Sequence, residues 1–294
     1  MPKLAAFPKG FIKQLVSGQM SIYEWIKLGD ELNVDGLEFY YNFADVKDAA
    51  NWAKVRKAVE DTGMVIPMMC ASPDFTIPDE SLRNKEIEKE IFAIEMSAAL
   101  GAKYCRVLSG QRRKDITREE GMKYVVDAIN ACIPAAKEHG VTLIIENHYK
   151  DDFWTEPEFA QMMDVFVDLV SRIDSPRFGV QFDPSNAIAA GEEPLELLEK
   201  VKHRVLTVGA SDRHLAGGSI EELRKQEGGS AGYVSFFKHG VIGQGLNDYD
   251  AIFSTLKSVG FGGWVSIEDG VDGMQNMIDS ADFLKEKITK YWGN

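Results

Sequence analysis

The sequence predicts an α/β protein with the (β/α)8 architecture, a TIM barrel, in one domain over residues 1–294. Strand-like and helix-like segments alternate from one end of the chain to the other, and no Pro/Ser-rich linker or change in composition divides them. The length suits one such barrel, which typically takes about 250 residues. Three of the strand-like segments also end on a carboxylate, and a barrel gathers such strand ends at one face.

The strands are expected at residues 4–7, 36–41, 64–70, 104–108, 141–146, 178–182, 204–208 and 263–267. The fifth of them, VTLIIE, is β-branched and apolar without alternation, which is typical of a strand buried on both faces.

The helices are expected at residues 21–32, 47–62, 79–100, 117–139, 156–171, 194–201, 248–258 and 273–291. Ser21 is a good N-cap for the first helix. Gly63, Gly101 and Gly140 directly follow the next three helices, where glycine commonly ends a helix. A doubly wound open sheet is the alternative, but no G-x-G-x-x-G follows the first strand.

Composition excludes several classes of function. The net charge of −13 argues against a surface for nucleic acid or anionic membranes, and no apolar run approaches the roughly 20 residues that span a bilayer. The N-terminal residues lack a secretory signal pattern. Cys70, Cys105 and Cys132 are too scattered for a disulfide framework, so we expect reduced thiols in a cytoplasmic protein. The oligomeric state stays open, a homo-oligomer included.

The three strand-end carboxylates are Glu146, Asp183 and Glu268. Carboxylates gathered at one barrel mouth repel each other unless a cation or a shared proton compensates, and a divalent ion with oxygen ligands would do so. Each acid alone also has a structural interpretation, as a helix cap or as the partner of an Arg or Lys. Asp183, which precedes Pro184, is the clearest candidate for such a cap.

Four segments extend this pattern: LIIENH (143–148), FGVQFDPSNAIAAGEEP (178–194), RVLTVGASDRH (204–214) and HGVIGQGLNDYDAIFSTLKSVGFGGWVSIEDG (239–270). In them the chain resembles the xylose isomerase-like TIM barrels, the sugar phosphate isomerases and epimerases. The resemblance implies that Glu146, Asp183 and Glu268 bind a divalent metal, and that Glu146 and Glu268 exchange protons with the carbon next to a carbonyl. It also implies a histidine ligand on the seventh strand, where this chain has Gly209.

Another histidine is therefore expected to complete the metal site. His239, on a connection long enough to reach the mouth, is the first choice as metal ligand. His148 is the second, but its place beside Glu146 better suits substrate contact or proton transfer. His214 is a further candidate for substrate contact.

Three more side chains are expected to line the mouth. Glu38 ends the second strand, and Trp154 follows the fifth, where its ring would either stack on a sugar or only pack locally in its loop. Arg106, in the fourth strand, has two interpretations of equal weight: it neutralises a phosphate or carboxylate of the substrate, or it pairs with a metal-site acid. Asn186 is expected to shape its loop rather than to touch substrate.

The leading functional hypothesis is a metal-dependent isomerase or epimerase that acts on a carbohydrate by proton transfer through an enediolate. Mn²⁺ or Mg²⁺ suits an all-oxygen site, and Co²⁺ or Zn²⁺ becomes favourable if an imidazole joins it. The alternatives are a keto-sugar dehydratase or lyase, including a glycoside-cleaving β-elimination, and a non-catalytic barrel subunit. A DNA-repair endonuclease of the same barrel type would need a basic face and a multi-metal cluster rich in histidine. The net charge of −13 and the presence of only five histidines oppose it.

The connection over residues 213–246 is long for a compact domain and is expected to be a lid over the mouth. Glycine pairs at 217–218 and 228–229 would allow movement. A surface insertion is the alternative, although Tyr233, Phe236 and Phe237 favour packing.

Overall fold

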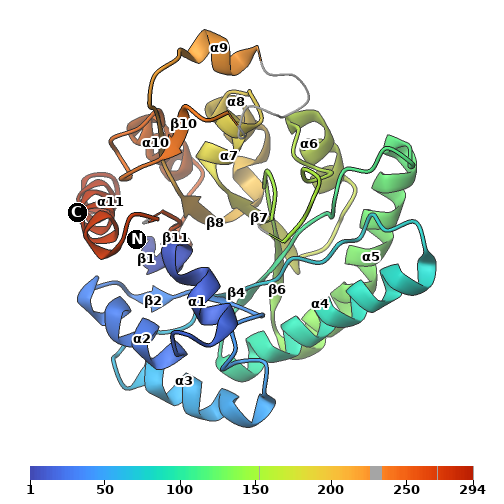
Figure 1. The fold of residues 1–294 in the computed structure, drawn as a ribbon, viewed down its shortest axis with the longest axis horizontal. Helices are drawn as coiled ribbons and strands as arrows, with labels where there is room; N and C mark the ends of the chain where they lie inside the picture. Colours follow the sequence, from blue (N-terminus) through green and yellow to red (C-terminus); the bar gives the residue numbers. More distant parts are fainter. Residues whose placement is uncertain (152, 226–233, 270, 294) are drawn as a thin grey trace.

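The computed structural model describes residues 1–151, 153–225, 234–269 and 271–293. Its centre is a sheet of parallel strands surrounded by helices (Figure 1). The strands are β1 (Lys3–Ala6), β2 (Gly36–Leu37), β3 (Phe39–Tyr40), β4 (Met68–Cys70), β5 (Tyr104–Val107), β6 (Thr142–Glu146), β7 (Phe178–Phe182), β8 (Val205–Ala210) and β11 (Trp264–Ile267). Their order in the sheet is β2-β1-β11-β8-β7-β6-β5-β4-β3.

The ring of strands closes through the second expected strand, which is interrupted at Glu38. Its first half, β2, pairs with β1, and its second half, β3, pairs with β4. Before the interruption, Gly36 pairs both with Ala5 of β1 and with Val65, so it connects the two sides of the ring there. The predicted single-domain (β/α)8 fold class is confirmed, with β1 beside the last strand β11.

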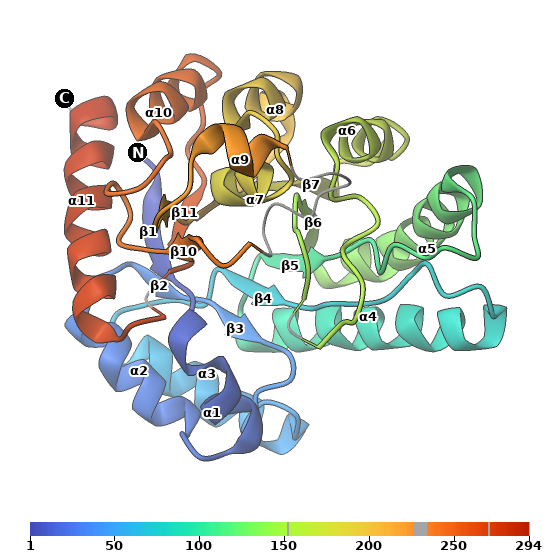
Figure 2. The ribbon, with the colours of Figure 1, turned by 45° about the horizontal axis from the view of Figure 1, so that its top comes forward.

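The outer layer contains the expected helices α2 (Ile22–Glu31), α3 (Trp52–Glu60), α4 (Glu80–Leu100), α5 (Arg118–His139), α6 (Met163–Ser171), α8 (Pro194–Val201), α10 (Tyr249–Ser258) and α11 (Met274–Trp292). Figure 2 shows them around the strands, with both chain ends on the side of α11. Ser21 caps α2 in a capping box with Glu24. Gly63, Gly101 and Gly140 follow their helices with φ between 69° and 85°, which glycine adopts without strain. None of the described helices is long and apolar enough to cross a membrane.

Two helix predictions were wrong in detail. The helix expected from residue 156 begins only at Met163, because the preceding residues run beside the loop after β5. Gln111 of that loop forms a β-bridge with Glu158, and the Phe159 N–H donates to Gly110 O at 2.7 Å. A short helix, α7 (Pro184–Ala189), was not expected after β7.

The connection over 213–246 is folded where it is described. Its strands β9 (Arg213–Leu215) and β10 (Phe237–His239) pair in antiparallel fashion, and α9 (Ile220–Arg224) lies between them in the chain. Leu223 and Phe237 are buried against Ile188 and Ala189 of α7 in a small hydrophobic cluster of their own. Packing of this segment is therefore confirmed, while lid movement stays a prediction. Gly228, Gly229 and Tyr233 lie outside the described residues.

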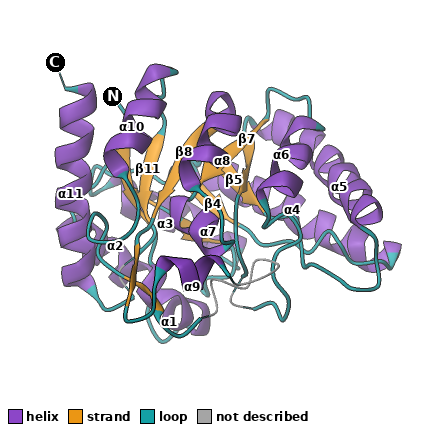
Figure 3. Cartoon of the chain, turned by 90° about the horizontal axis from the view of Figure 1, so that it is seen from above, coloured by secondary structure: helices purple, strands orange, loops and turns teal. Residues whose placement is uncertain are grey.

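The barrel interior contains a layer of buried polar side chains beneath the strand ends. Glu38, Gln181, Thr207 and Ser266 are fully buried there. The apolar core lies instead between strands and helices, where Trp25, Phe166 and Phe253 are among the largest fully buried side chains. Figure 3 shows the helical layer from above, with the strands enclosed.

Candidate active site

Glu146, Asp183 and Glu268 converge at the C-terminal ends of β6, β7 and β11. One ligand oxygen of each lies within 4.8 Å of the other two. All three residues are buried, with exposed fractions of 1% to 3%. Oxygens this close can share one divalent ion at the usual 2.0–2.6 Å. The expectation that the three acids meet holds in the structure, and their ligand role remains to be tested.

Glu146 is held in its ionised form by the groups around it. Arg106 Nη1, from β5, donates to Glu146 Oε2 at 2.6 Å, and Asn186 Nδ2, from α7, donates to Oε1 at 2.9 Å. Burial alone would raise the pKa of Glu146, but His148, Arg106 and Lys9 outweigh it and hold the pKa below its usual value. Arg106 thus pairs with a site acid, the second of its two predicted roles.

The other two acids differ from Glu146 in the direction of their pKa. Burial, followed by repulsion from Glu146 and Asp183, raises the pKa of Glu268 well above its ordinary value. Burial and Glu146 raise the pKa of Asp183 to about 6, although Ser211 Oγ donates to Asp183 Oδ1 at 2.7 Å. A cation among the three would favour the ionised form of both.

Asp183 also caps a helix, as the structural interpretation expected. Its Oδ1 accepts the Asn186 N–H of α7 at 3.0 Å. Asn147 links the end of β6 to the end of β7. Its Nδ2 donates to Asp183 O at 2.7 Å, and its Oδ1 accepts the Asp183 N–H at 2.8 Å. The cap leaves Asp183 Oδ2 available, so capping and metal binding are compatible.

A small cavity opens beside Glu268 at the barrel mouth. It is lined by Phe7, Lys9, Ile12, Tyr40, Arg106, His148, Tyr149, Lys150, Asp151, Phe153 and Glu268. The space open to water is about 40 Å³, enough for only a few water molecules. Of the site residues predicted from the sequence, Arg106, His148 and Glu268 line this cavity.

Lys9 lines this cavity and was not predicted. It follows β1 in a short 3-10 helix (Lys9–Phe11) and forms no side-chain hydrogen bond or ion pair with the described part of the chain. Burial, which alone would lower the pKa of Lys9, is outweighed by Tyr149, Glu268 and Glu146, so the pKa is raised. Its position directly after the first strand was the available signal, because barrel strands deliver functional groups at that end.

His148 faces the cavity with a buried carboxylate behind it. Its Nδ1 lies 3.3 Å from Glu158 Oε2, and Glu158 is fully buried. The other oxygen, Glu158 Oε1, accepts the N–H and the hydroxyl of Ser109 at 2.7 and 2.8 Å. Neither His148 Nδ1 nor Glu158 Oε2 has a hydrogen-bond partner among the described residues, so this is a close contact between the ring and the carboxylate, on the Nδ1 side of the imidazole. Glu158 was missed because it lay inside an expected helix.

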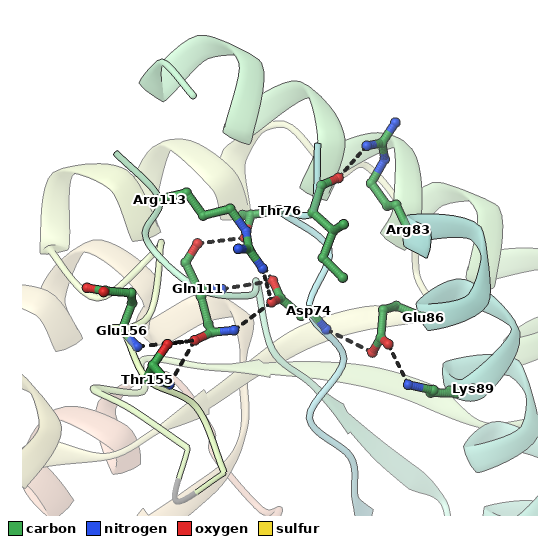
Figure 4. A network of polar contacts seen from close by, with 10 residues as sticks. Asp74, Thr76, Arg83, Glu86, Lys89, Gln111, Arg113, Thr155 and Glu156 are labelled. Atoms are coloured by element: carbon green, nitrogen blue, oxygen red, sulfur yellow. Dashed lines mark hydrogen bonds and ion pairs between the residues drawn. The ribbon is translucent and has the colours of Figure 1, made fainter. Parts of the chain in front are cut away.

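The loop after β6, which carries His148 and Glu158, is held in place by a network of polar contacts (Figure 4). Gln111 Oε1 accepts the backbone N–H groups of Thr155 and Glu156 at 2.9 and 3.1 Å, while Gln111 Nε2 donates to Asp74 Oδ2 at 2.8 Å. Asp74 also pairs with Arg113. The loop after β6 is thereby held against the loops after β4 and β5.

The remaining predicted residues lie away from the cavity. Phe153, not its neighbour Trp154, lines it, and the Phe153 ring stacks on Tyr40 with centroids 6.3 Å apart. His214 is exposed on β9. Glu38 lies in the buried polar layer, where burial raises its pKa to about 8.

His239 is not part of the group of close ligand atoms. Its Nδ1 lies 2.8 Å from Asp269 Oδ1. Only Nε2 is then available to a metal, so the predicted ligand role of His239 requires that atom. Burial, with Arg213 and Lys9, lowers the pKa of His239 to about 2, which keeps the imidazole neutral.

The comparison with known families identifies the fold. The family model described as xylose isomerase-like TIM barrel matches residues 26–287. The chain belongs to this family. Curated relatives of this xylose isomerase-like barrel include an inosose dehydratase of Bacillus thuringiensis, 24% identical over 60% of the chain and 58% of the relative. A 3-oxo-isoapionate decarboxylase of Pectobacterium atrosepticum is 28% identical over 56% of the chain and 50% of the relative. The chain thus spans little more than half the length of these relatives.

Solved structures of xylose isomerase-like barrels match almost the whole chain. A D-tagatose 3-epimerase-like protein superposes with a TM-score of 0.78 at 20% identity, over 98% of both chains. The IolI protein with a bound zinc atom superposes with a TM-score of 0.76 at 18% identity, over 99% of this chain and 100% of the other. At these identities the likeness establishes the fold.

Proposed function

We propose that this xylose isomerase-like barrel is a divalent-metal-dependent isomerase or epimerase that moves a proton at the carbon next to the carbonyl of a keto-sugar. The observation that carries the proposal is the buried group of Glu146, Asp183 and Glu268, in which the pKa of Glu146 is lowered and that of Glu268 is raised. Paired acids whose pKa values are driven apart are a recurring arrangement for proton transfer.

The three acids would hold the metal. Their oxygens are close enough to share one ion, and a cation among them would offset the burial and mutual repulsion that raise the pKa values of Asp183 and Glu268. When bound, the ion supplies Lewis-acid stabilisation of negative charge on a carbonyl oxygen. The zinc atom in the IolI structure supports a metal in this type of barrel.

The cavity supports a division of roles among the proposed catalytic residues. Glu268 and His148 line it and would exchange a proton with substrate. The lowered pKa of Glu146 keeps this carboxylate ionised, which suits it to hold the metal, although it stays a candidate for proton transfer. Lys9 and Arg106 would bind substrate oxygens.

The substrate class follows from the relatives and from the lining. The related inosose dehydratase, oxo-isoapionate decarboxylase and tagatose-epimerase-like protein are named for polyhydroxy compounds. The stacked rings of Phe153 and Tyr40 offer an apolar face for a sugar. Because the cavity has room for only a few water molecules, a sugar would have to displace mouth side chains such as Phe153, which is 58% exposed.

A dehydratase or lyase is the second candidate, and the names of the curated relatives favour it. The same deprotonated carbon can expel a leaving group from the neighbouring carbon instead of taking a proton back. In that reaction the acid that returns the proton, Glu268 or His148, would protonate the leaving oxygen.

The test is solvent deuterium incorporation. Protein freed of metal by a chelator, and then reloaded with Mn²⁺, is incubated in D₂O with D-tagatose, D-fructose, D-psicose and an inosose. Proton NMR should show metal-dependent exchange at the carbon beside the carbonyl, which is lost in Glu268→Gln. An enone absorbance band would assign the lyase reaction instead. Neither signal with a metal-loaded protein would refute both candidates, and absence of Mn²⁺ binding would favour the non-catalytic subunit.

A further inference from the structure

A side chain at position 209 would meet two side chains of the site. A Cβ built on Gly209 of β8 would lie 2.7 Å from Glu268 Oε1 and 3.0 Å from Gln181 Nε2. Both atoms are the ends of flexible side chains, so a larger residue at 209 would have to push them aside. With glycine at 209, Gln181 occupies the space in front of it.

Gln181 lies on β7, two residues before Asp183, so both side chains point to the same side of the strand. It is fully buried. Its Nε2 donates to Glu268 Oε1, the orientation of the carboxamide that suits an ionised, metal-bound Glu268, because a carboxylate accepts only from the NH₂ group. Gln181 Oε1 has no hydrogen-bond partner among the described residues. A buried amide oxygen without a partner is costly, so a missing partner is expected at this atom.

We propose that Gln181 Oε1 is the fourth protein ligand of the divalent ion held by Glu146, Asp183 and Glu268, in place of a ligand from position 209. The inference rests on the proposed metal site. It makes the donor set three carboxylates and one carboxamide, all oxygen, which favours hard ions such as Mn²⁺ and Mg²⁺ over Zn²⁺. It also leaves His239 with Asp269 and outside the metal site.

The rival role for Gln181 is to orient Glu268 through Nε2 alone. Titration calorimetry with Mn²⁺ alone separates the two roles in wild type, Gln181→Leu and Gln181→Glu. A ligand role predicts that Gln181→Leu loses at least tenfold in affinity and that Gln181→Glu, which keeps an oxygen donor, stays within about threefold. Equal affinity in Gln181→Leu and wild type overturns the proposal. A loss in Gln181→Glu as large as in Gln181→Leu also overturns it, because the amide N–H would then be the group that matters.

Two further variants keep the test decisive. Thr207→Val is the matched control, since Thr207 Oγ1 is also a fully buried oxygen without a hydrogen-bond partner in the described ranges and lies opposite Gln181 on β8. It should leave Mn²⁺ affinity unchanged, and a tenfold loss would contradict a specific role for Gln181. Gln181→His, if Gln181→Leu fails to fold, should shift the affinity ratio of Zn²⁺ to Mn²⁺ by at least tenfold, and an unchanged ratio refutes ligation. If wild type binds no Mn²⁺, the proposed function fails instead.

Discussion

Arg106 and Glu146, on the adjacent strands β5 and β6, form an ion pair at 2.6 Å in which both side chains are almost completely buried. The guanidinium also reaches Ser72 Oγ at 3.3 Å. A buried pair of this kind contributes little when intact, but loss of one partner leaves an uncompensated charge in the barrel.

Arg106→Met should therefore destabilise the protein by about 3–5 kcal/mol, and added Mn²⁺ should recover part of the loss, because a cation again faces Glu146. Denaturant unfolding with and without Mn²⁺ measures both effects. Arg56→Met is the control, since the exposed Arg56–Glu60 pair should cost less than about 1 kcal/mol. Equal losses in the two variants would show that the buried charge is compensated by other groups.

Metal affinity should rise with pH. The ion binds ionised carboxylates, whereas the raised pKa values of Glu268 and Asp183, the latter to about 6, mean that the metal-free site retains protons. Mn²⁺ binding should release at least one proton at pH 6 and fewer as the pH rises. Calorimetry in buffers of different ionisation enthalpy counts these protons. No proton release at pH 6 would mean that the acids are already ionised without metal.

Replacement of either glutamate should impair both turnover and metal binding. Glu268→Gln should lower turnover by at least about a hundredfold, the usual scale for a general acid or base, and Glu146→Gln should lower it at least as much. Both variants should also lower Mn²⁺ affinity, because each loses a charged ligand. Near-normal turnover in either variant would remove that residue from the mechanism.

Glu158 should act through His148. If its only contribution is to fix the imidazole, Glu158→Gln lowers kcat about tenfold or more in the wild-type background and has no further effect in a His148→Gln background. Glu192→Gln is the control, because the partly buried Glu192 bonds to the Met163 N–H at 2.8 Å, away from the cavity lining. Additive losses in the double variant would show a structural role for Glu158.

Glu90 should make stability depend on pH. Oε2 of this fully buried residue of α4 has no hydrogen-bond partner in the part of the chain that the structure describes, and burial raises the pKa of Glu90 to about 8. Between its ordinary value near 4.3 in the unfolded chain and about 8, the folded protein keeps a proton that the unfolded chain has lost, so the folded state loses stability as pH rises through this window. Glu90→Gln should flatten this slope, measured as the free energy of unfolding at pH 5 and pH 8. Parallel slopes in the two proteins would contradict the pKa shift.

The strand-end acids were predictable because one rule of the fold, that parallel barrel strands deliver functional groups at one face, applies to each of them separately. No comparable rule predicts which side chains of a loop point into the site. Phe153 and Trp154 are neighbours, yet only Phe153 lines the cavity. Gln181 was hidden for another reason: it belongs to a buried strand, and its importance depends on Gly209 of the adjacent strand, a contact that spacing in the chain does not reveal.

The pairing of β1 with β11 has a consequence for biosynthesis. Residues 3–6 can complete their hydrogen bonds only with residues 264–267, which are translated after every other strand of the sheet. Until then β1 and β8 each present an open edge, and such edges recruit strands from other chains. A truncated chain that ends before β11 should therefore accumulate as aggregate, and nascent chains of this protein should depend on a chaperone until β11 has emerged.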